Sequence, residues 1–216
     1  MTKLKWDQTG EKLYETGVSN GVLYLTDENG KFKKATAWNG LTKVSEAPSG
    51  AETTSLYADN AKYLNLVSAE EFGFTIEAYT YPDEFAQCDG SAELATGITV
   101  GQQTRKTFGF SYKTLVGNDV KGDEFGYKLH IVYGCKASPS SKDYQSVNDS
   151  PEAMSLSWEV KTTPVPVPNM KPTATVIIDS TKITPEKLKL VEDALYGTES
   201  EEAYLPTPEE LIALVS

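Results

Sequence analysis

The sequence predicts a mainly antiparallel β domain, built as a sandwich or a barrel, with a short helix packed at its side. Three observations support this fold class. Several segments alternate apolar and polar residues with a period of two, which is typical of strands that bury one face. Gly, Asn and Asp residues separate these segments, where tight turns are expected. Helical periodicity is confined to a short segment in mid-chain and to the C-terminal part.

Composition narrows the class of protein. The 216 residues are 39% hydrophobic and 24% charged, as in an ordinary globular domain. A net charge of −11 repels phosphates, so specific binding or storage of nucleic acid is not expected. The same charge would let DNA slide past without sticking, or would simply keep the protein soluble. The sequence contains no apolar run long enough for a membrane span or a signal peptide, so we expect synthesis in a cytoplasm and no membrane partner.

The first elements are an arm and a hairpin. Residues 1–20 have little periodicity and are expected to form an irregular N-terminal arm. Residues 21–25 alternate as a first strand, residues 27–30 (DENG) form a turn, and residues 31–38 form the hairpin partner.

Residues 39–66 interrupt this pattern. Turn residues punctuate the segment and no long period runs through it. Long connections inside compact domains are uncommon and often functional, so we expect a loop whose apolar side chains contact another molecule. The alternative is that these side chains fold back onto their own core, as extra strands. The candidate contact residues of the loop and of the residue before it are Trp38, Leu41, Val44, Leu56, Tyr57, Tyr63 and Leu64.

The clearest strand patterns follow this loop. They cover residues 72–78, 108–112, 125–135 and 154–160. The third segment places Cys135 on its apolar face and His130 on its polar face. Between the first two strands a short helix is expected to begin at Pro82 and to end at Gly90.

The C-terminal part has a different composition. Four prolines between residues 164 and 172 predict an extended linker, and residues 173–178 predict a strand that is apolar, and hence buried, on both faces. Helices are expected after Thr184 and Thr207, the second with a capping box. Their apolar faces need a surface to cover them. The candidate contacts of this arm are Leu188, Val191, Leu195, Leu211 and Ile212.

These patterns divide the chain into three parts. Residues 1–20 form the N-terminal arm, residues 21–163 form the β domain with its loop 39–66, and residues 164–216 form the linker, the extra strand and the acidic helical arm.

Catalytic constellations are absent from the sequence. The single histidine, His130, has no recognisable partner for a catalytic triad or a metal site. Cys88 and Cys135 are expected to be free thiols in the core. Residues 119–124 lack the spacing of a calcium loop, and the glycosylation pattern at residues 148–150 is a coincidence because Pro151 follows it. We therefore expect a protein that is not an enzyme, with no cofactor and no metal.

A series of short segments resembles one family. In order, they are residues 38–42 (WNGLT), 52–60 (ETTSLYADN), 63–64 (YL), 70–73 (EEFG), 79–89 (YTYPDEFAQCD), 101–103 (GQQ), 105–106 (RK), 108–119 (FGFSYKTLVGND), 126–134 (GYKLHIVYG), 148–151 (NDSP) and 195–197 (LYG). In that order and spacing the chain resembles the major tail protein, or tail tube protein, of long, non-contractile tails of bacteriophages that infect Gram-positive bacteria. The resemblance runs from about residue 17 to residue 197 and departs at the termini.

The resemblance implies an assembly and its partners. Such subunits form six-membered rings that stack into a tube, and double-stranded DNA passes through the lumen. A long loop after the first hairpin and the terminal arms join stacked rings, which would assign residues 39–66 and 164–216. The implied partners are further copies of the chain and the tape measure, tail terminator and distal tail proteins. The implied location is the tail of the virion, assembled in the cytoplasm of the host.

Two other interpretations stay open at this point. A carbohydrate-binding β-sandwich of a virion or cell surface could use the plentiful Tyr and Trp residues, although most of them alternate into strand cores. The tube of a headless phage-like particle would have the same sequence features. In any tube, fixed positive charges would slow DNA, so the lumen-facing candidates are acidic residues on polar strand faces: Glu71, Glu77 and Glu159.

Overall fold

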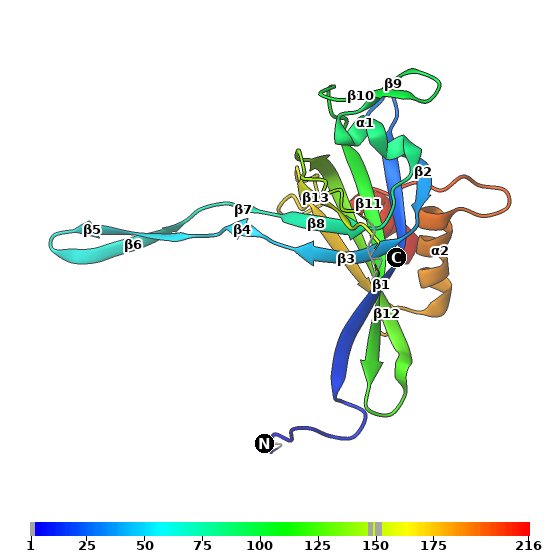
Figure 1. The fold of residues 1–216 in the computed structure, drawn as a ribbon. Coiled ribbons are helices and arrows are strands. Elements are labelled where there is room, and N and C mark those ends of the chain that lie inside the picture. Colours follow the sequence, from blue (N-terminus) through cyan, green and yellow to red (C-terminus); the bar gives the residue numbers. More distant parts are fainter. Residues whose placement is uncertain (1–2, 147–148, 150–152) are drawn as a thin grey trace.

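The computed structural model describes residues 3–146, 149 and 153–216. Figure 1 shows a mainly antiparallel β fold, as predicted, from which a long two-stranded arm extends. The strands are β1 (Leu13–Thr26), β2 (Phe32–Trp38), β3 (Leu41–Glu46), β4 (Ser49–Gly50), β5 (Thr53–Ala58), β6 (Ala61–Val67), β7 (Glu70–Glu71), β8 (Gly73–Ala78), β9 (Ala92–Ala95), β10 (Ile98–Val100), β11 (Phe108–Asn118), β12 (Gly122–Ala137), β13 (Leu156–Lys161) and β14 (Thr175–Asp179). The helices are η1 (Asp83–Phe85), α1 (Ala86–Asp89), α2 (Pro185–Tyr196) and α3 (Pro208–Val215).

The main sheet has eight strands and folds over into two layers. Seven strands follow the order β2-β1-β11-β12-β13-β8-β3. The eighth, β14, pairs with the middle of β12, whereas β13 pairs with its end. Strand β12 belongs to both layers, because its middle pairs with β11 and β14 while its last two residues, Lys136 and Ala137, pair with β13. All pairings are antiparallel.

The first core lies between the two layers. It is rich in aromatic rings: the Trp38 centroid lies 4.6 Å from that of Phe85 and 5.6 Å from that of Trp158. Phe74 and Phe110 stack beside them with centroids 6.0 Å apart. The short helix formed by η1 and α1 begins after Pro82 and ends at Gly90, as predicted, and it contributes Phe85 to this core.

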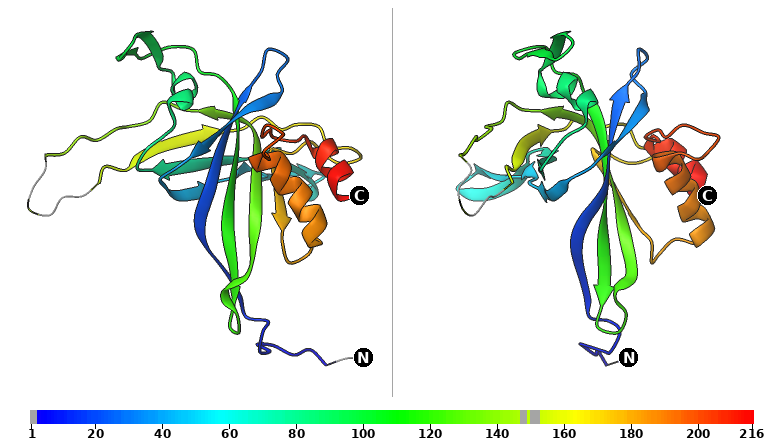
Figure 2. Two further views of the ribbon diagram at one scale, coloured as in Figure 1. Left: turned by 90° about the vertical axis from the view of Figure 1, so that its right-hand side faces the viewer. Right: turned by 45° about the vertical axis from the view of Figure 1, so that its right-hand side comes forward.

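The second core lies between the sheet and the C-terminal helices (Figure 2). Helix α2 buries Leu188, Val191 and Leu195 against residues of β1 and β12, and the hydroxyl group of Tyr24 donates a hydrogen bond to the Leu195 carbonyl over 2.7 Å. Helix α3 has the predicted capping box and buries Leu211. The sequence left open whether this arm packs on its own subunit or on a neighbour, and these four side chains lie in the second core of their own chain. Ile212 stays 47% exposed.

Strand β1 begins earlier than predicted. The sequence predicted a strand at residues 21–25 after an irregular arm, but residues 13–16 already pair with the end of β11. This part of the sheet projects beyond both cores (Figure 1), and residues 13–17 of β1 are exposed on both of its faces. A strand without a buried face has no apolar alternation, so the period of two could not reveal it.

A bulge in β12 corrects a second prediction. Residues 125–135 were expected to keep one apolar face, but Gly134 has φ +58° and shifts the register between β11 and β12. Leu129 and Tyr133 therefore belong to the second core, whereas Cys135 belongs to the first. A one-residue shift moves every later side chain to the opposite face.

The burial of β14 and the first residue of β13 also differ from the prediction. Strand β14 was expected to be buried on both faces, but it lies beside β12 with Ile177 half exposed. Its inner residues Val176 and Ile178 pack against the second core. Strand β13 begins at Leu156, so Met154 lies outside it and is exposed.

We predict that the packing of α2 on its own sheet stabilises the isolated chain. Leu195→Ala removes a side chain that is fully buried and should lower the free energy of unfolding by about 2–5 kcal/mol. Leu190→Ala, on the outer side of the same helix and 48% exposed, should cost less than about 1 kcal/mol. Urea unfolding of the dilute protein, followed by tryptophan fluorescence, measures both. Equal costs for the two variants would contradict the observed packing.

Candidate functional site

The segment between β3 and β8 is a β ribbon that leaves the body of the protein (Figure 1). We call residues 47–72 the arm. Strands β4 and β7 pair near its base, and β5 and β6 pair along its outer part. Asp59 and Asn60 turn the chain at the tip with φ angles of +49° and +60°, as two-residue hairpin turns require. Residues 39–66 were predicted to form an irregular loop, but most of them form strands.

The outer arm carries apolar side chains that have no core of their own. Tyr57 and Tyr63 are each 72% exposed, and Leu56 faces Leu64 across the ribbon while both stay exposed. Leu66 and Val67, nearer the base, are also exposed, and the apolar side chains occupy both faces of the ribbon. Exposed apolar side chains gathered on one projecting element typically mark an interaction site.

Three of the predicted contact residues pack in the body of the protein and are not on the arm. Trp38 is 3% exposed, and its indole nitrogen donates a hydrogen bond to the Thr80 carbonyl over 2.9 Å. Leu41 and Val44 lie on β3 and pack against the first core. The alternative that part of this segment folds back as an extra strand is thus confirmed for β3, whereas Leu56, Tyr57, Tyr63 and Leu64 lie on the arm.

A buried polar cluster lies at the root of the arm, and sequence reasoning missed it. His130 was expected on a polar strand face, but it is only 6% exposed. Its ring stacks on Tyr112 with centroids 4.5 Å apart and planes 7° apart. The Tyr112 hydroxyl group donates to Glu46, the last residue of β3, over 2.8 Å. The register that places Tyr112 opposite His130 is seen only in the structure, so the alternation of the two strands gave no signal for this cluster.

Three further residues complete this cluster: Thr114, Glu15 and Lys128. The Thr114 hydroxyl group lies 2.9 Å from His130 Nε2 and donates to Glu15 over 2.6 Å, and Glu15 forms an ion pair with Lys128. Burial lowers the pKa of His130 in spite of the two nearby carboxylates. Burial also opposes the ionised form of Glu15, but hydrogen bonds from Lys128 and Thr114 keep its pKa below the usual value.

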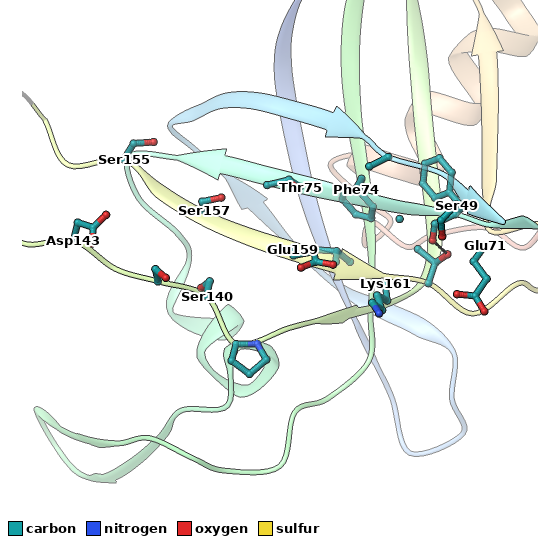
Figure 3. A pocket seen from close by; sticks show the side chains of 17 residues that line it. Ser49, Glu71, Phe74, Thr75, Ser140, Asp143, Ser155, Ser157, Glu159 and Lys161 are labelled. Atoms are coloured by element: carbon teal, nitrogen blue, oxygen red, sulfur yellow. Dashed lines mark hydrogen bonds between the residues drawn. The ribbon is translucent and has the colours of Figure 1, made fainter.

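A polar groove of about 560 Å³ lies on the outer face of β8 and β13 (Figure 3). Hydroxyl groups and carboxylates line it, among them those of Ser157, Glu71 and Glu159, together with Lys161. Glu77 lies outside this lining and pairs with Lys43 over 3.3 Å. Two of the three predicted lumen residues therefore share one concave surface.

The remaining chemistry of the described residues is sparse. They contain no group of three or more His, Cys, Asp or Glu side chains placed to hold a metal ion, and none of the described helices is long and apolar enough to span a membrane. Cys88 and Cys135 are free and buried, and burial raises the pKa of Cys88 to about 12. The 148–151 segment lies, apart from Asp149, outside the described residues.

Comparisons with known proteins find similarity among solved structures but none in sequence. No family model matches the chain, and no curated protein matches it. Among solved structures, the chain is similar to one from the cryo-EM structure of the anti-feeding prophage (AFP) baseplate, six-fold symmetrised, with 8% sequence identity and a TM-score of 0.38. The similarity covers 81% of this chain and 97% of that one.

We predict that the apolar side chains of the arm add little to the stability of the isolated chain. Replacing Tyr57 and Tyr63 together by Ser should change the free energy of unfolding by less than about 1 kcal/mol, because both side chains are exposed. Urea unfolding at low protein concentration tests this expectation. A loss of several kcal/mol would mean that the arm packs against its own body in solution.

Proposed function

We propose that this chain is the building block of a bacteriophage tail tube, which assembles into stacked six-membered rings around a lumen for double-stranded DNA. The family resemblance of the sequence supports this proposal. The observation that carries it is the arm, whose apolar side chains touch no core of their own chain. The role is structural, without catalysis and without a cofactor.

The arm suits a contact between stacked subunits. An isolated two-stranded ribbon is marginally stable in water, and its exposed Tyr and Leu side chains would favour aggregation unless a specific partner covered them. Aromatic side chains are enriched at the centres of protein interfaces, where they bury large surfaces. A second copy of the chain in the next ring is the partner that we propose for residues 47–72.

The body suits a ring subunit in two respects. Strand β2 ends one side of the main sheet and β3 ends the other, and pairing between neighbouring subunits would protect such edges. The groove that holds Glu71 and Glu159 gives a polar, partly acidic face, which we assign to the lumen together with Glu77.

The tail terminator, tape measure and distal tail proteins would be the other partners, and the virion tail the location.

The first test of this function is assembly. Tyr63→Ser should abolish tube growth, because it removes an aromatic ring at the outer arm. Tyr144→Ser is the matched control, since Tyr144 is also an exposed tyrosine but lies outside the arm, in the segment between β12 and β13, and should leave tube growth unchanged. Negative-stain electron microscopy of the purified proteins gives the readout.

The outcomes separate the candidate functions. Rings or tubes of the wild-type chain are expected, with single rings or monomers for Tyr63→Ser. Wild-type protein that stays monomeric at high concentration and binds glycans on an array would instead favour the carbohydrate-binding module. Tubes from Tyr63→Ser would remove the arm from the stacking contact.

The second test concerns the lumen. Glu159→Lys should permit assembly, because Glu159 is exposed, belongs to neither core and lies outside the arm. The new positive charge should slow DNA release from particles, and the delay should weaken as salt rises, since screening shortens its reach. Release is measured by fluorescence of a DNA-binding dye after triggering. Unchanged release at low salt would contradict the assignment of this groove to the lumen.

A further inference from the structure

The polar cluster around His130 holds the root of the arm to the body. Glu46 and Phe74 form the last pair of the ladder between β3 and β8 before the arm begins. The Glu46 carboxylate reaches from this pair to Tyr112 on β11, and the stacked ring of His130 connects the contact to β12. Side chains of three strands therefore meet at the root of the arm, beside the backbone hydrogen bond from Ala47 to Gly73.

The hydrogen bonds define which nitrogen of His130 carries a proton. Because the Thr114 hydroxyl group donates its proton to Glu15, it must accept a hydrogen bond from Nε2–H of His130. The other ring nitrogen, Nδ1, is then an acceptor, and it is buried without a hydrogen-bond partner among the described residues. Its nearest acidic neighbour is an oxygen of Glu46, at 3.6 Å.

The closed cluster is poorly built for a charged imidazole ring. The carboxylate oxygens of Glu46 and Glu15 lie 3.6 and 3.5 Å from the two ring nitrogens, which is longer than an N–H···O hydrogen bond. Glu15 is already paired with Lys128, whose positive charge opposes protonation of the ring, and Glu46 already accepts from Tyr112. A second proton on His130 would thus create a buried charge with no direct partner at Nδ1.

We propose that His130 is a proton-sensitive latch at the root of the arm, which holds the arm in place while the ring is neutral and releases it when the ring is protonated. Release means that the end of β3 parts from β11 and β12 far enough for water to reach Nδ1. The proposal concerns the root alone and holds whether or not the arm joins subunits of a tube.

The direction of the response follows from linkage. The pKa of His130 is lowered in the closed cluster by burial, whereas a hydrated histidine has a pKa of about 6.5. The open root therefore binds the proton more tightly, and lowering the pH through this range favours opening. At pH 5 the open population can rise by at most about 30-fold, which is the limit for a closed state that takes up no proton.

The single histidine of the chain makes the test direct. Carbon-bound ring protons of His130 are followed by NMR as the pH is lowered, and an apparent pKa below about 6.5 is expected. Hydrogen exchange with mass spectrometry then compares protection factors of residues 41–46 and 73–78 at pH 7.5 and pH 5.0. Protection at the root should fall several-fold at pH 5.0, while residues 188–195 of α2 keep theirs.

Three variants complete the experiment. His130→Gln keeps a donor for Thr114 but cannot titrate, so its root protection should be equal at both pH values. Glu46→Gln offers an amide donor to Nδ1 of the neutral ring and should lower the apparent pKa of His130 further. Glu52→Gln, on the exposed arm, is the matched control and should leave the titration unchanged.

Four results would overturn the latch. They are a pKa of His130 above about 6.5, equal root protection of the wild-type protein at both pH values, a loss of protection spread over α2 as well, and a pH response that survives in His130→Gln. The first three need only the wild-type protein, so they decide the question even if a variant fails to fold.

Discussion

The sharing of β12 between the two layers is the constraint on which the rest of the structure depends. Gly134 makes it possible: its φ of +58° is available to glycine at little cost, and a Cβ atom there would lie 2.3 Å from the Thr163 carbonyl oxygen. Before the bulge β12 contributes Leu129 and Tyr133 to the helix-covered core, and after it Cys135 belongs to the core between the layers. One strand thus divides its side chains between two cores.

The two cores stabilise the body of the protein, and the projecting strands outside it have no hydrophobic core of their own. The arm and the lower ends of β1, β11 and β12 project from the body (Figures 1 and 2). Exposed strands with apolar side chains are a liability for a soluble monomer, which is why we assign the arm to an interface. The polar cluster around Glu46 and His130 lies where the arm meets the body, because Glu46 at the end of β3 contacts Tyr112 of β11.

Much of the fold could be predicted from the sequence, and the failures share a cause. Alternation found β8 and β11, and cap residues found both C-terminal helices. The same pattern could not find the first half of β1 or the outer arm, because strands exposed on both faces leave no period of two. For the candidate contacts, sequence reasoning identified Tyr57 and Tyr63 on the arm but also included Trp38, which is a core residue.

The sequence by itself determined the strands that bury one face, the turns between them and the capped helices, because these depend on neighbouring residues: a helix begins after Thr207 through its own capping box. Only the tertiary structure decided what covers each apolar face. The Leu195 face of α2 meets its own sheet and not another subunit, and His130 is buried between strands distant in sequence. Periodicity reports that a face will be covered, but the covering surface comes from residues far along the chain, and local patterns carry no information about them.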